Sequence, residues 1–132
     1  MPSLFTKIIN GDLPCHKVAE SEDFFAFFDI NPNAVGHTLC VPKKEVNKLF
    51  DLDENTYKNL MLFSRKVALA LRQVVACKRV GMSVIGLEVP HVHVHLIPLN
   101  HMDEMRFEQK VKMNDEEFSA LAKKVSYAFS KI

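Results

Sequence analysis

The sequence has little cysteine, and no two cysteines lie at a spacing that binds a metal. Its three cysteines, Cys15, Cys40 and Cys77, are odd in number and far apart, and no Cys-x-x-Cys occurs. These features argue against a disulfide framework and against a cysteine zinc site. We therefore expect reduced thiols and a cytoplasmic protein.

Long hydrophobic runs are also lacking. No stretch approaches the roughly 18 apolar residues of a membrane-spanning helix, and the first residues lack the apolar run of a secretion signal. The net charge is only +1 over 132 residues, which gives no reason to expect a nucleic-acid groove or a membrane surface as partner. Repeats, linkers and low-complexity segments are absent as well. We expect one domain over residues 1–132, which is long enough to bury a core without disulfides.

Apolar residues recur at helical spacing in three places, with short strand-like runs between them. The predicted helices cover residues 4–9, 53–77 and 114–131, and the predicted strands cover residues 18–20, 24–28, 36–42, 79–85 and 91–97. Asn114 with Glu117 forms a capping-box-like start of the last helix. A helix between two strand pairs, with short connections, favours an α+β fold in which helices pack on one face of an antiparallel sheet.

Histidine alternates with apolar residues from His91 to Leu96. Alternation is the period of a half-buried strand, so His91, His93 and His95 are expected on one face, roughly 6.5 to 7 Å apart. Pro98 cannot donate a backbone hydrogen bond and is expected to end this strand or to mark a sheet edge. Three imidazoles within five residues favour a chemical role over three incidental side chains.

Two chemical roles fit three imidazoles on one strand face. Histidines two residues apart can chelate a zinc ion. Alternatively, one neutral imidazole can attack phosphorus or carbon while its neighbours position and protonate the groups around it. The spacing does not separate these hypotheses. Taken alone, His37 at a strand start is typical of an incidental histidine, and Asp29 before Asn31 is typical of a turn.

Four segments over about the first 100 residues match one known pattern, in order. They are Phe5-x-Lys7-Ile8-Ile9-x-Gly11-x-Leu13-Pro14, Ala26-Phe27-x-Asp29-Ile30-x-Pro32, Gly36-His37-Thr38-Leu39-x-Val41-Pro42-Lys43 and Gly86-x-x-Val89-Pro90-His91-Val92-His93-Val94-His95-Leu96-Ile97. Together they resemble the histidine triad (HIT) superfamily, in its bacterial nucleotide-binding branch. The predicted C-terminal helix, residues 114–131, lies outside the resemblance.

The resemblance implies a homodimeric α+β protein that binds purine nucleotides and hydrolyses or transfers them at the α-phosphate. In that superfamily the middle histidine attacks phosphorus, so His93 is the expected nucleophile of a covalent nucleotidyl-histidine, which water then cleaves. His95 and His37 are expected to bind the phosphate or to assist proton transfer, and His91 to support the site. Asp29 matches the residue that hydrogen-bonds the ribose hydroxyls. The apolar purine pocket corresponds to Leu4, Phe5, Ile8, Phe27 and Ile30.

Three places depart from the superfamily pattern. Leu87 and Glu88 stand where the bacterial branch commonly has Gln and a small hydroxyl residue. Glu88 is therefore a candidate contact to the leaving group, either as a proton donor or as a solvated carboxylate. Residues 79–83 stand where an Asn often contacts phosphate. Residues 3–6 take the place of the Cys-x-x-Cys pair of zinc-containing members, so we expect no metal and no other cofactor.

The sequence thus predicts a metal-independent hydrolase that cleaves purine nucleoside phosphoramidates and releases the nucleoside monophosphate. One alternative is a hydrolase of dinucleoside polyphosphates. Another is a nucleotide-binding sensor with little turnover, which the altered Leu87 and Glu88 positions would suit.

Overall fold

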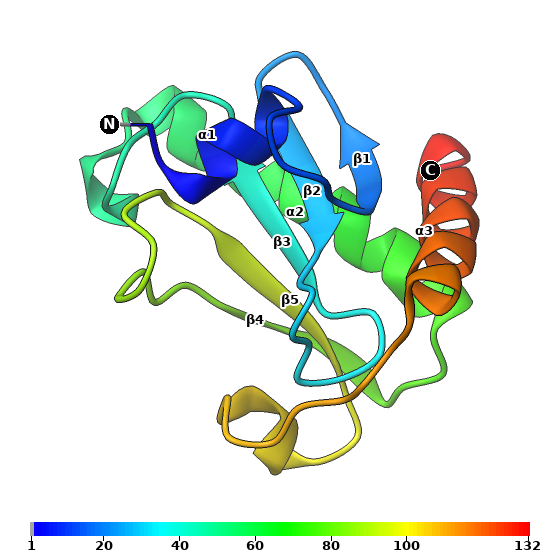
Figure 1. Ribbon diagram of the computed structural model, residues 1–132. Coiled ribbons are helices and arrows are strands. Elements are labelled where there is room, and N and C mark those ends of the chain that lie inside the picture. Colours follow the sequence, from blue (N-terminus) through cyan, green and yellow to red (C-terminus); the bar gives the residue numbers. More distant parts are fainter. Residues whose placement is uncertain (1) are drawn as a thin grey trace.

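The computed structural model describes residues 2–132, which form a five-stranded sheet and three α-helices (Figure 1). The strands are β1 (Lys17–Glu20), β2 (Phe24–Phe28), β3 (Thr38–Pro42), β4 (Arg79–Ser83) and β5 (Val94–Leu99), in the spatial order β1-β2-β3-β5-β4. The helices are α1 (Leu4–Ile9), α2 (Glu54–Val74) and α3 (Asp115–Ser130), with two short 3-10 helices, η1 (Leu49–Asp51) and η2 (Met102–Met105). Every pair of neighbouring strands is antiparallel. The predicted α+β class and antiparallel sheet are confirmed.

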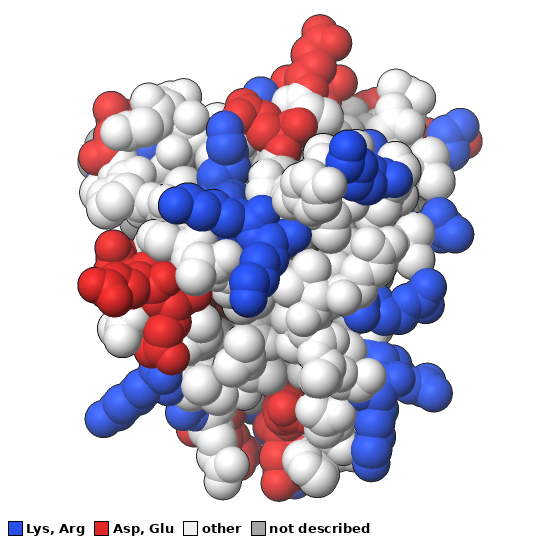
Figure 2. Space-filling model, turned by 90° about the vertical axis from the view of Figure 1, so that its right-hand side faces the viewer, with Lys and Arg blue, Asp and Glu red and all other residues white. Residues whose placement is uncertain are grey.

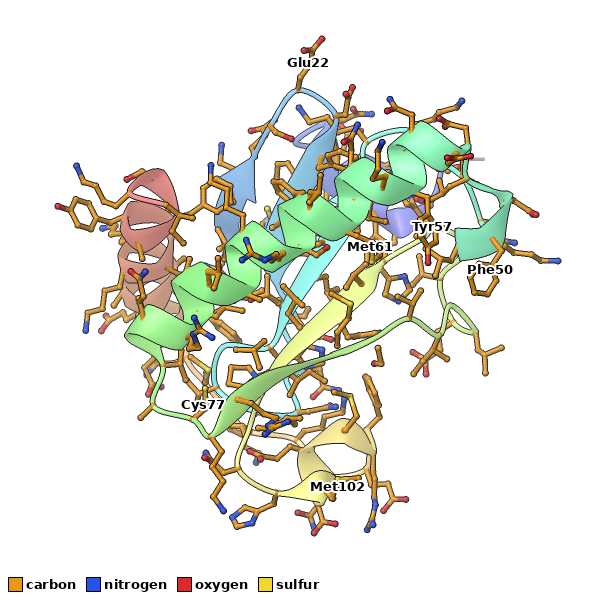
Figure 3. The ribbon with its side chains drawn as sticks, turned by 180° about the vertical axis from the view of Figure 1, so that it is seen from behind. Glu22, Phe50, Tyr57, Met61, Cys77 and Met102 are labelled. Atoms are coloured by element: carbon orange, nitrogen blue, oxygen red, sulfur yellow. The ribbon has the colours of Figure 1, made fainter. Side chains whose placement is uncertain are left out.

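The two long helices cover one face of the sheet. α2 runs across the back of the sheet and α3 packs beside it, against β1 (Figure 3). Fully buried Leu60, Val67 and Leu71 of α2 meet sheet residues such as Ala26 and Leu96 in the larger part of the core. The packing of α2 and α3 on one face agrees with the prediction. An apolar stripe at helical spacing is expected to bury against an apolar sheet face.

The short helix α1 lies on the opposite face, so the helices do not all pack on one side. Phe5 of α1 is buried against Phe25, Phe27 and Leu39 of the sheet. Because both faces of β2 are covered, all five of its residues are buried, which explains why residues 24–28 are continuously apolar. A helix of six residues has too few apolar positions to indicate from sequence which face it covers.

Side-chain caps fix the starts of the long helices. Asp53 caps α2 by accepting from the backbone N–H of Thr56. In α3 the predicted capping box is present: Asn114 Oδ1 accepts from Glu117 N at 2.8 Å, and Glu117 Oε1 accepts from Asn114 N at 3.0 Å. α2 ends at Val74, three residues before the predicted end.

The histidine strand begins later than predicted. β5 starts at Val94, so His95 belongs to the strand, whereas His91 and His93 lie in the segment that leads into it. This lead-in has no strand partner, because β3 pairs with β5 only from Cys40 opposite Val94 onward. The side chains of His91 and His93 therefore need not follow the orientation that a paired strand would impose.

Pro98 neither ends β5 nor marks a sheet edge. It pairs with Val80 on β4, within a strand that has neighbours on both sides. β3 begins at Thr38, opposite Leu96, so no strand beside Pro98 on that side needs the missing N–H.

The face of the molecule that carries α3 displays both basic and acidic side chains, with uncharged atoms between them (Figure 2). Within residues 2–132, none of the helices has the length and apolarity that crossing a bilayer demands.

Candidate active site

A cavity of about 660 Å³ lies on the α1 side of the sheet, next to the histidine segment. α1, β3, β5 and the segments 85–89 and 106–110 contribute to its walls. Six of the predicted site residues line it: Leu4, Phe5, Asp29, Glu88, His93 and His95. The other five lie outside the lining: Ile8, Phe27, Ile30, His37 and His91.

His93 presents a ring nitrogen lone pair to this cavity. Its Nδ1 lies 2.7 Å from the carbonyl oxygen of His91. Because a carbonyl only accepts, Nδ1 carries the proton and Nε2 is left with its lone pair. Burial lowers the pKa of His93, and the bond to the His91 carbonyl opposes that shift only in part. A neutral ring with a free Nε2 is the form that a nucleophile needs.

His91 faces away from the cavity and is fully buried. Its Nε2–H donates to the carbonyl oxygen of Pro42 at 2.7 Å, so Nδ1 accepts, and Ser3 Oγ donates to it at 2.7 Å. Both ring nitrogens are therefore engaged within the protein, and a zinc site made of His91, His93 and His95 is not formed. His91 instead joins the start of α1 to the end of β3, beneath the segment that holds His93.

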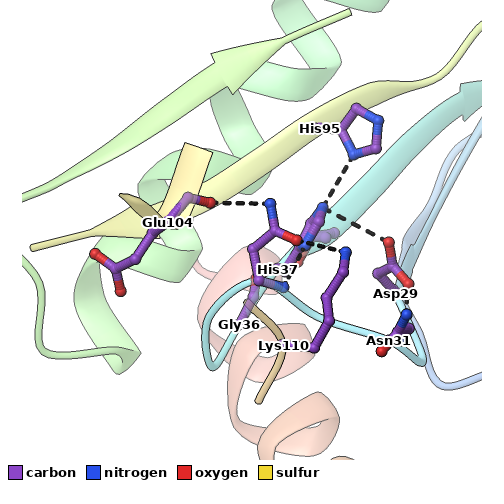
Figure 4. A network of polar contacts seen from close by, with 9 residues as sticks. Asp29, Asn31, Gly36, His37, His95, Glu104 and Lys110 are labelled. Atoms are coloured by element: carbon purple, nitrogen blue, oxygen red, sulfur yellow. Dashed lines mark hydrogen bonds and ion pairs between the residues drawn. The ribbon is translucent and has the colours of Figure 1, made fainter. Parts of the chain in front are cut away.

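His95 and His37 form a hydrogen-bonded pair (Figure 4). The backbone N–H of Asn33 donates to His37 Nδ1 at 3.0 Å, so His37 carries its proton on Nε2. This Nε2–H donates to His95 Nδ1 at 3.0 Å, which leaves the proton of His95 on its own Nε2. His95 lines the cavity, and His37 is fully buried behind it. The pair thus offers the cavity one N–H donor.

Neither imidazole of this pair is charged near neutral pH. Burial is the main cause that lowers the pKa of His37 to about 3 and the pKa of His95 to about 4. Repulsion from a neighbouring histidine and from the ammonium group of Lys110 lowers both values further. The histidines therefore bring hydrogen-bonding groups to the cavity but no positive charge.

Asp29 lies in the cavity wall, with Oδ2 3.7 Å from His37 Nε2. Its Oδ1 accepts from the backbone N–H of Asn31 at 2.9 Å, the contact of an Asx turn. Burial raises the pKa of the carboxyl, and the Asn31 bond and the Lys110 charge oppose that shift. Asp29 is thus a turn residue and a cavity residue at once, and its contact to a ribose stays a prediction.

The apolar wall of the cavity differs in composition from the prediction, because it includes Leu39, Ile85 and Val89. Leu4 and Phe5 line it, and Phe27 lies behind Phe5, with the ring centroids 5.5 Å apart. Ile8 packs against the same cluster. Ile30 is 75% exposed and is not part of the cavity lining.

The loop before the histidine segment brings Glu88 to the cavity. Gly86 has a φ of +75° in this loop, a left-handed conformation that glycine adopts without strain. Leu87, 90% exposed, and the exposed Glu88 follow it along the cavity rim. The negative charge of Glu88 contributes to the raised pKa of Asp29, so the two carboxyls lie within electrostatic range. A contact from Glu88 to a leaving group stays a prediction.

Nine residues of the cavity lining are not among the predicted site residues. Three of them come from a segment to which the sequence assigned no role in the site: Arg106, Phe107 and Lys110. The Phe107 ring lies edge-on to His95, with centroids 4.8 Å apart, in a residue whose φ is +63°. The segment from residue 99 to residue 112 is polar and without periodicity. It therefore carries no signal in sequence that would place it beside histidines.

One group within residues 2–132 could hold a metal ion: Asp29, His37 and His95, whose ligand atoms lie within 4.8 Å of one another. Two of these ligand atoms, His37 Nε2 and His95 Nδ1, are hydrogen-bonded to each other. A metal would have to break that bond in order to bind both rings. The expected independence from metal stays a prediction.

Comparisons with known proteins agree with this arrangement. A HIT-like protein of Borreliella burgdorferi is 34% identical, with 93% of this chain and 95% of that protein covered. An adenosine 5'-monophosphoramidase of Schizosaccharomyces pombe is also 34% identical, over 74% of each chain. The crystal structure of a HIT-like protein from Bartonella henselae, described as involved in cell-cycle regulation, superposes with a TM-score of 0.83 at 30% identity, covering 96% of this chain and 95% of that one.

The family profile described as the HIT domain matches residues 10–102, which span β1 to β5 and all four histidines of the site. The structural match to the Bartonella protein extends over nearly the whole chain, beyond the profile on both sides. The chain therefore belongs to the HIT family, as the four sequence segments indicated.

Proposed function

We propose that this protein is a hydrolase that cleaves purine nucleoside phosphoramidates at the α-phosphate and releases the nucleoside monophosphate. The observation that carries the proposal is the proton held on His93 Nδ1, which leaves Nε2 free at the cavity wall. The name of the Schizosaccharomyces pombe relative supports a phosphoramidate as substrate.

In the first proposed step, the lone pair of His93 Nε2 forms a bond to phosphorus, and the bond from phosphorus to the leaving amine breaks. The amine takes up a proton from solvent as it leaves, and the His93 ring becomes cationic. The Nε2–H of His95 stands in the same cavity and donates to a phosphoryl oxygen, where negative charge grows in the transition state.

In the second step, water attacks phosphorus and the bond to His93 Nε2 breaks. The cationic ring is a good leaving group, because it departs as the neutral imidazole with its proton still on Nδ1. The proton that water loses balances the proton that the amine gained. The cycle therefore needs no oxidant, reductant or cofactor.

The rest of the cavity would bind the nucleoside. Asp29 is a half-buried carboxyl that can accept hydrogen bonds from a ribose diol, and Leu4 and Phe5 offer an apolar wall to a flat base. The Phe5 ring also packs edge-on against His93, with centroids 4.8 Å apart. The cavity thus offers side chains suited to the base, the ribose and the phosphate of one nucleotide.

The test is turnover of adenosine 5'-phosphoramidate by His93→Ala. We expect the rate to fall by at least about 10³-fold, because the covalent step loses its nucleophile. Binding of AMP should change by less than about threefold, since base and ribose contacts remain. Intact-protein mass spectrometry of the wild type during turnover should reveal one added nucleotidyl group, which is absent from the variant.

His16→Ala is the matched control, because it removes an imidazole that contacts Asp115 and Phe118 outside the cavity. Its turnover should equal that of the wild type. Full activity of His93→Ala would contradict the proposal. Tight nucleotide binding by the wild type, with no product from any substrate, would favour a sensor instead.

A dinucleoside polyphosphate is the second candidate substrate, and the basic residues of the cavity favour it. Arg106 and Lys110 both line the cavity, and a polyphosphate leaving group would bring them additional negative charge. The ratio of kcat/KM for the phosphoramidate and for a diadenosine polyphosphate decides between the two substrates.

A further inference from the structure

The cavity needs a positive charge that the histidines do not supply. A nucleotide phosphate is an anion, whereas the pKa values of His37 and His95 lie at about 3 and about 4, so these rings are neutral near pH 7. The cavity lining also holds two carboxyls, Asp29 and Glu88, which repel an anion when ionised. Its basic residues are Arg106 and Lys110, both from the segment after η2.

These two basic residues differ in their partners. Arg106 Nη1 lies 2.7 Å from Asp103 Oδ1, so its guanidinium already has a carboxylate partner in an exposed ion pair. Lys110 has no ion pair with a carboxylate anywhere in residues 2–132; its Nζ donates to the side-chain oxygen of Asn33 at 2.6 Å. An amide oxygen leaves the ammonium charge uncompensated, and two of its three N–H donors stay available.

Asn33 holds Lys110 at the site. It is buried, and both ends of its side-chain amide are engaged, since the oxygen accepts from Lys110 and the NH₂ donates to the carbonyl of Glu104 at 2.9 Å. Its backbone N–H donates to His37 Nδ1 at 3.0 Å. The backbone N–H of Val111 also donates to the carbonyl of Pro32 at 2.9 Å. Lys110 is thus attached to the loop that carries Asp29 and His37 (Figure 4). Lys110 is an exposed residue whose ammonium group nevertheless has this buried residue as a partner.

We infer that Lys110 is a substrate-binding residue, whose ammonium group donates to a phosphate oxygen of the bound nucleotide on the side of the cavity formed by His95. This inference rests on the proposed function and adds to it the source of the charge that binds the phosphate. The residue makes the site prefer a nucleoside that carries a phosphate over a bare nucleoside. It reaches the cavity from a segment beyond the three histidines.

Electrostatic effects within the site agree with this placement. The Lys110 charge lowers the pKa values of His37, His95 and Asp29, so the ammonium group acts on the residues around the expected phosphate position. A bound phosphate is negatively charged, so it would attract the Lys110 ammonium group and offset the repulsion between that group and a protonated histidine.

The experiment compares the binding of AMP and adenosine by titration calorimetry in the wild type, Lys110→Gln and Lys112→Gln. Lys112 is the matched control, because it is an exposed lysine of the same segment outside the cavity lining. We expect Lys110→Gln to weaken AMP binding by about tenfold or more, the usual size of a lost charge-assisted hydrogen bond. Adenosine binding should stay unchanged in both variants, and Lys110→Arg should recover most of the AMP affinity.

Two outcomes would overturn the inference while leaving the proposed function in place. One is AMP binding by Lys110→Gln that equals the wild type. The other is an equal loss for AMP and adenosine, which would mean that Lys110 only supports the loop. Turnover of the phosphoramidate by the wild type, measured on the same samples, tests the proposed function separately. A wild type that binds neither ligand would contradict both.

Discussion

At the scale of single residues, one local contact separates His93 from the other three histidines of the site. His91, His37 and His95 carry their ring proton on Nε2, whereas His93 carries it on Nδ1, because its ring turns back to the carbonyl two residues earlier. The free Nε2 of His93 faces the cavity as an acceptor, and the Nε2–H of His95 faces it as a donor. In the proposed mechanism, the attacking atom and the group that stabilises charge would thus come from neighbouring positions of one segment.

The lowered histidine pKa values predict a loss of stability in acid. Below an unfolded-state pKa of about 6.5, the unfolded chain binds a proton at His95 that the folded protein does not bind until about pH 4. The stabilisation is therefore complete above about pH 7 and is lost as the pH falls from about 6.5 to 4. We expect His95 to account for about 2 kcal/mol of the unfolding free energy lost between pH 7 and pH 5.

Urea unfolding of the wild type and of His95→Gln at these two pH values measures this contribution. The pH dependence should be weaker in His95→Gln, whereas His101→Gln, which alters an exposed histidine outside the cavity lining, should keep the full dependence. The prediction fails if all three proteins lose the same free energy.

The sequence predicted the position of site residues that belong to a recognisable motif. It did not predict site residues that lie outside such a motif. The pattern around His93 and His37 located both side chains at one site, because four segments had to coincide for the match. The protonated nitrogen of each ring depends on contacts to Pro42, Asn33 and backbone carbonyls, which no spacing reveals. Lys110 could not be predicted, since its partner Asn33 lies 77 positions away in the chain.

At the scale of elements, α1 is held to the site by its first residues. Ser3 Oγ donates to His91 Nδ1 and also accepts from the backbone N–H of Thr6, as the N-cap of α1. Glu45 Oε1 accepts from Ser3 N at 2.6 Å and from Thr6 Oγ1 at 2.7 Å. These bonds are the main cause that lowers the pKa of Glu45 to about 2. The Glu45 carboxylate, which follows β3, thus anchors the helix that carries Phe5.

Ser3→Ala should destabilise the protein by about 1 to 3 kcal/mol. The variant loses the cap of α1 and leaves His91 Nδ1, a buried acceptor, without a partner. Urea unfolding measures the loss. Ser126→Ala, an exposed serine on α3, is the control and should change stability by less than about 0.5 kcal/mol. Equal stability of the two variants would show that the Ser3 contacts contribute nothing.

The elements that sequence predicted best are those with one covered face. α2 and α3 show clear stripes and caps, and their positions were confirmed within a few residues. β2 was recognised as a strand, but its continuous apolar run gave no sign of which helix covers each face. The predicted start of the histidine strand was wrong because the alternation already runs through His91 and His93, which precede β5.

At the scale of the whole molecule, the sheet ends in two different edges, β1 and β4. α3 packs against β1. Near β4, three large apolar side chains are exposed: Met82 at 45%, Ile85 at 51% and Leu87 at 90%. An uncovered edge strand with apolar neighbours is suited to pairing with another chain, and the homodimer implied by the family resemblance would use this edge.

Light scattering of the protein at micromolar concentration tests this prediction, with an expected mass of two chains. Met82→Glu should shift the mass toward one chain, because it places a charge in the expected interface. Tyr127→Glu is the control, since Tyr127 is 67% exposed on α3, away from β4. A wild type with the mass of one chain would contradict the dimer.

The buried residue Asn33 connects the segment around Glu104 and Lys110 to the loop that carries His37. The 106–110 segment packs on the outside, whereas His37 is buried within the sheet side of the cavity. If that segment detached, the ammonium group of Lys110 would move away and the proton affinities of His37 and His95 would rise. Loop opening is therefore thermodynamically linked to proton uptake at the imidazole pair: acid would favour the open loop, and a bound anion the closed one.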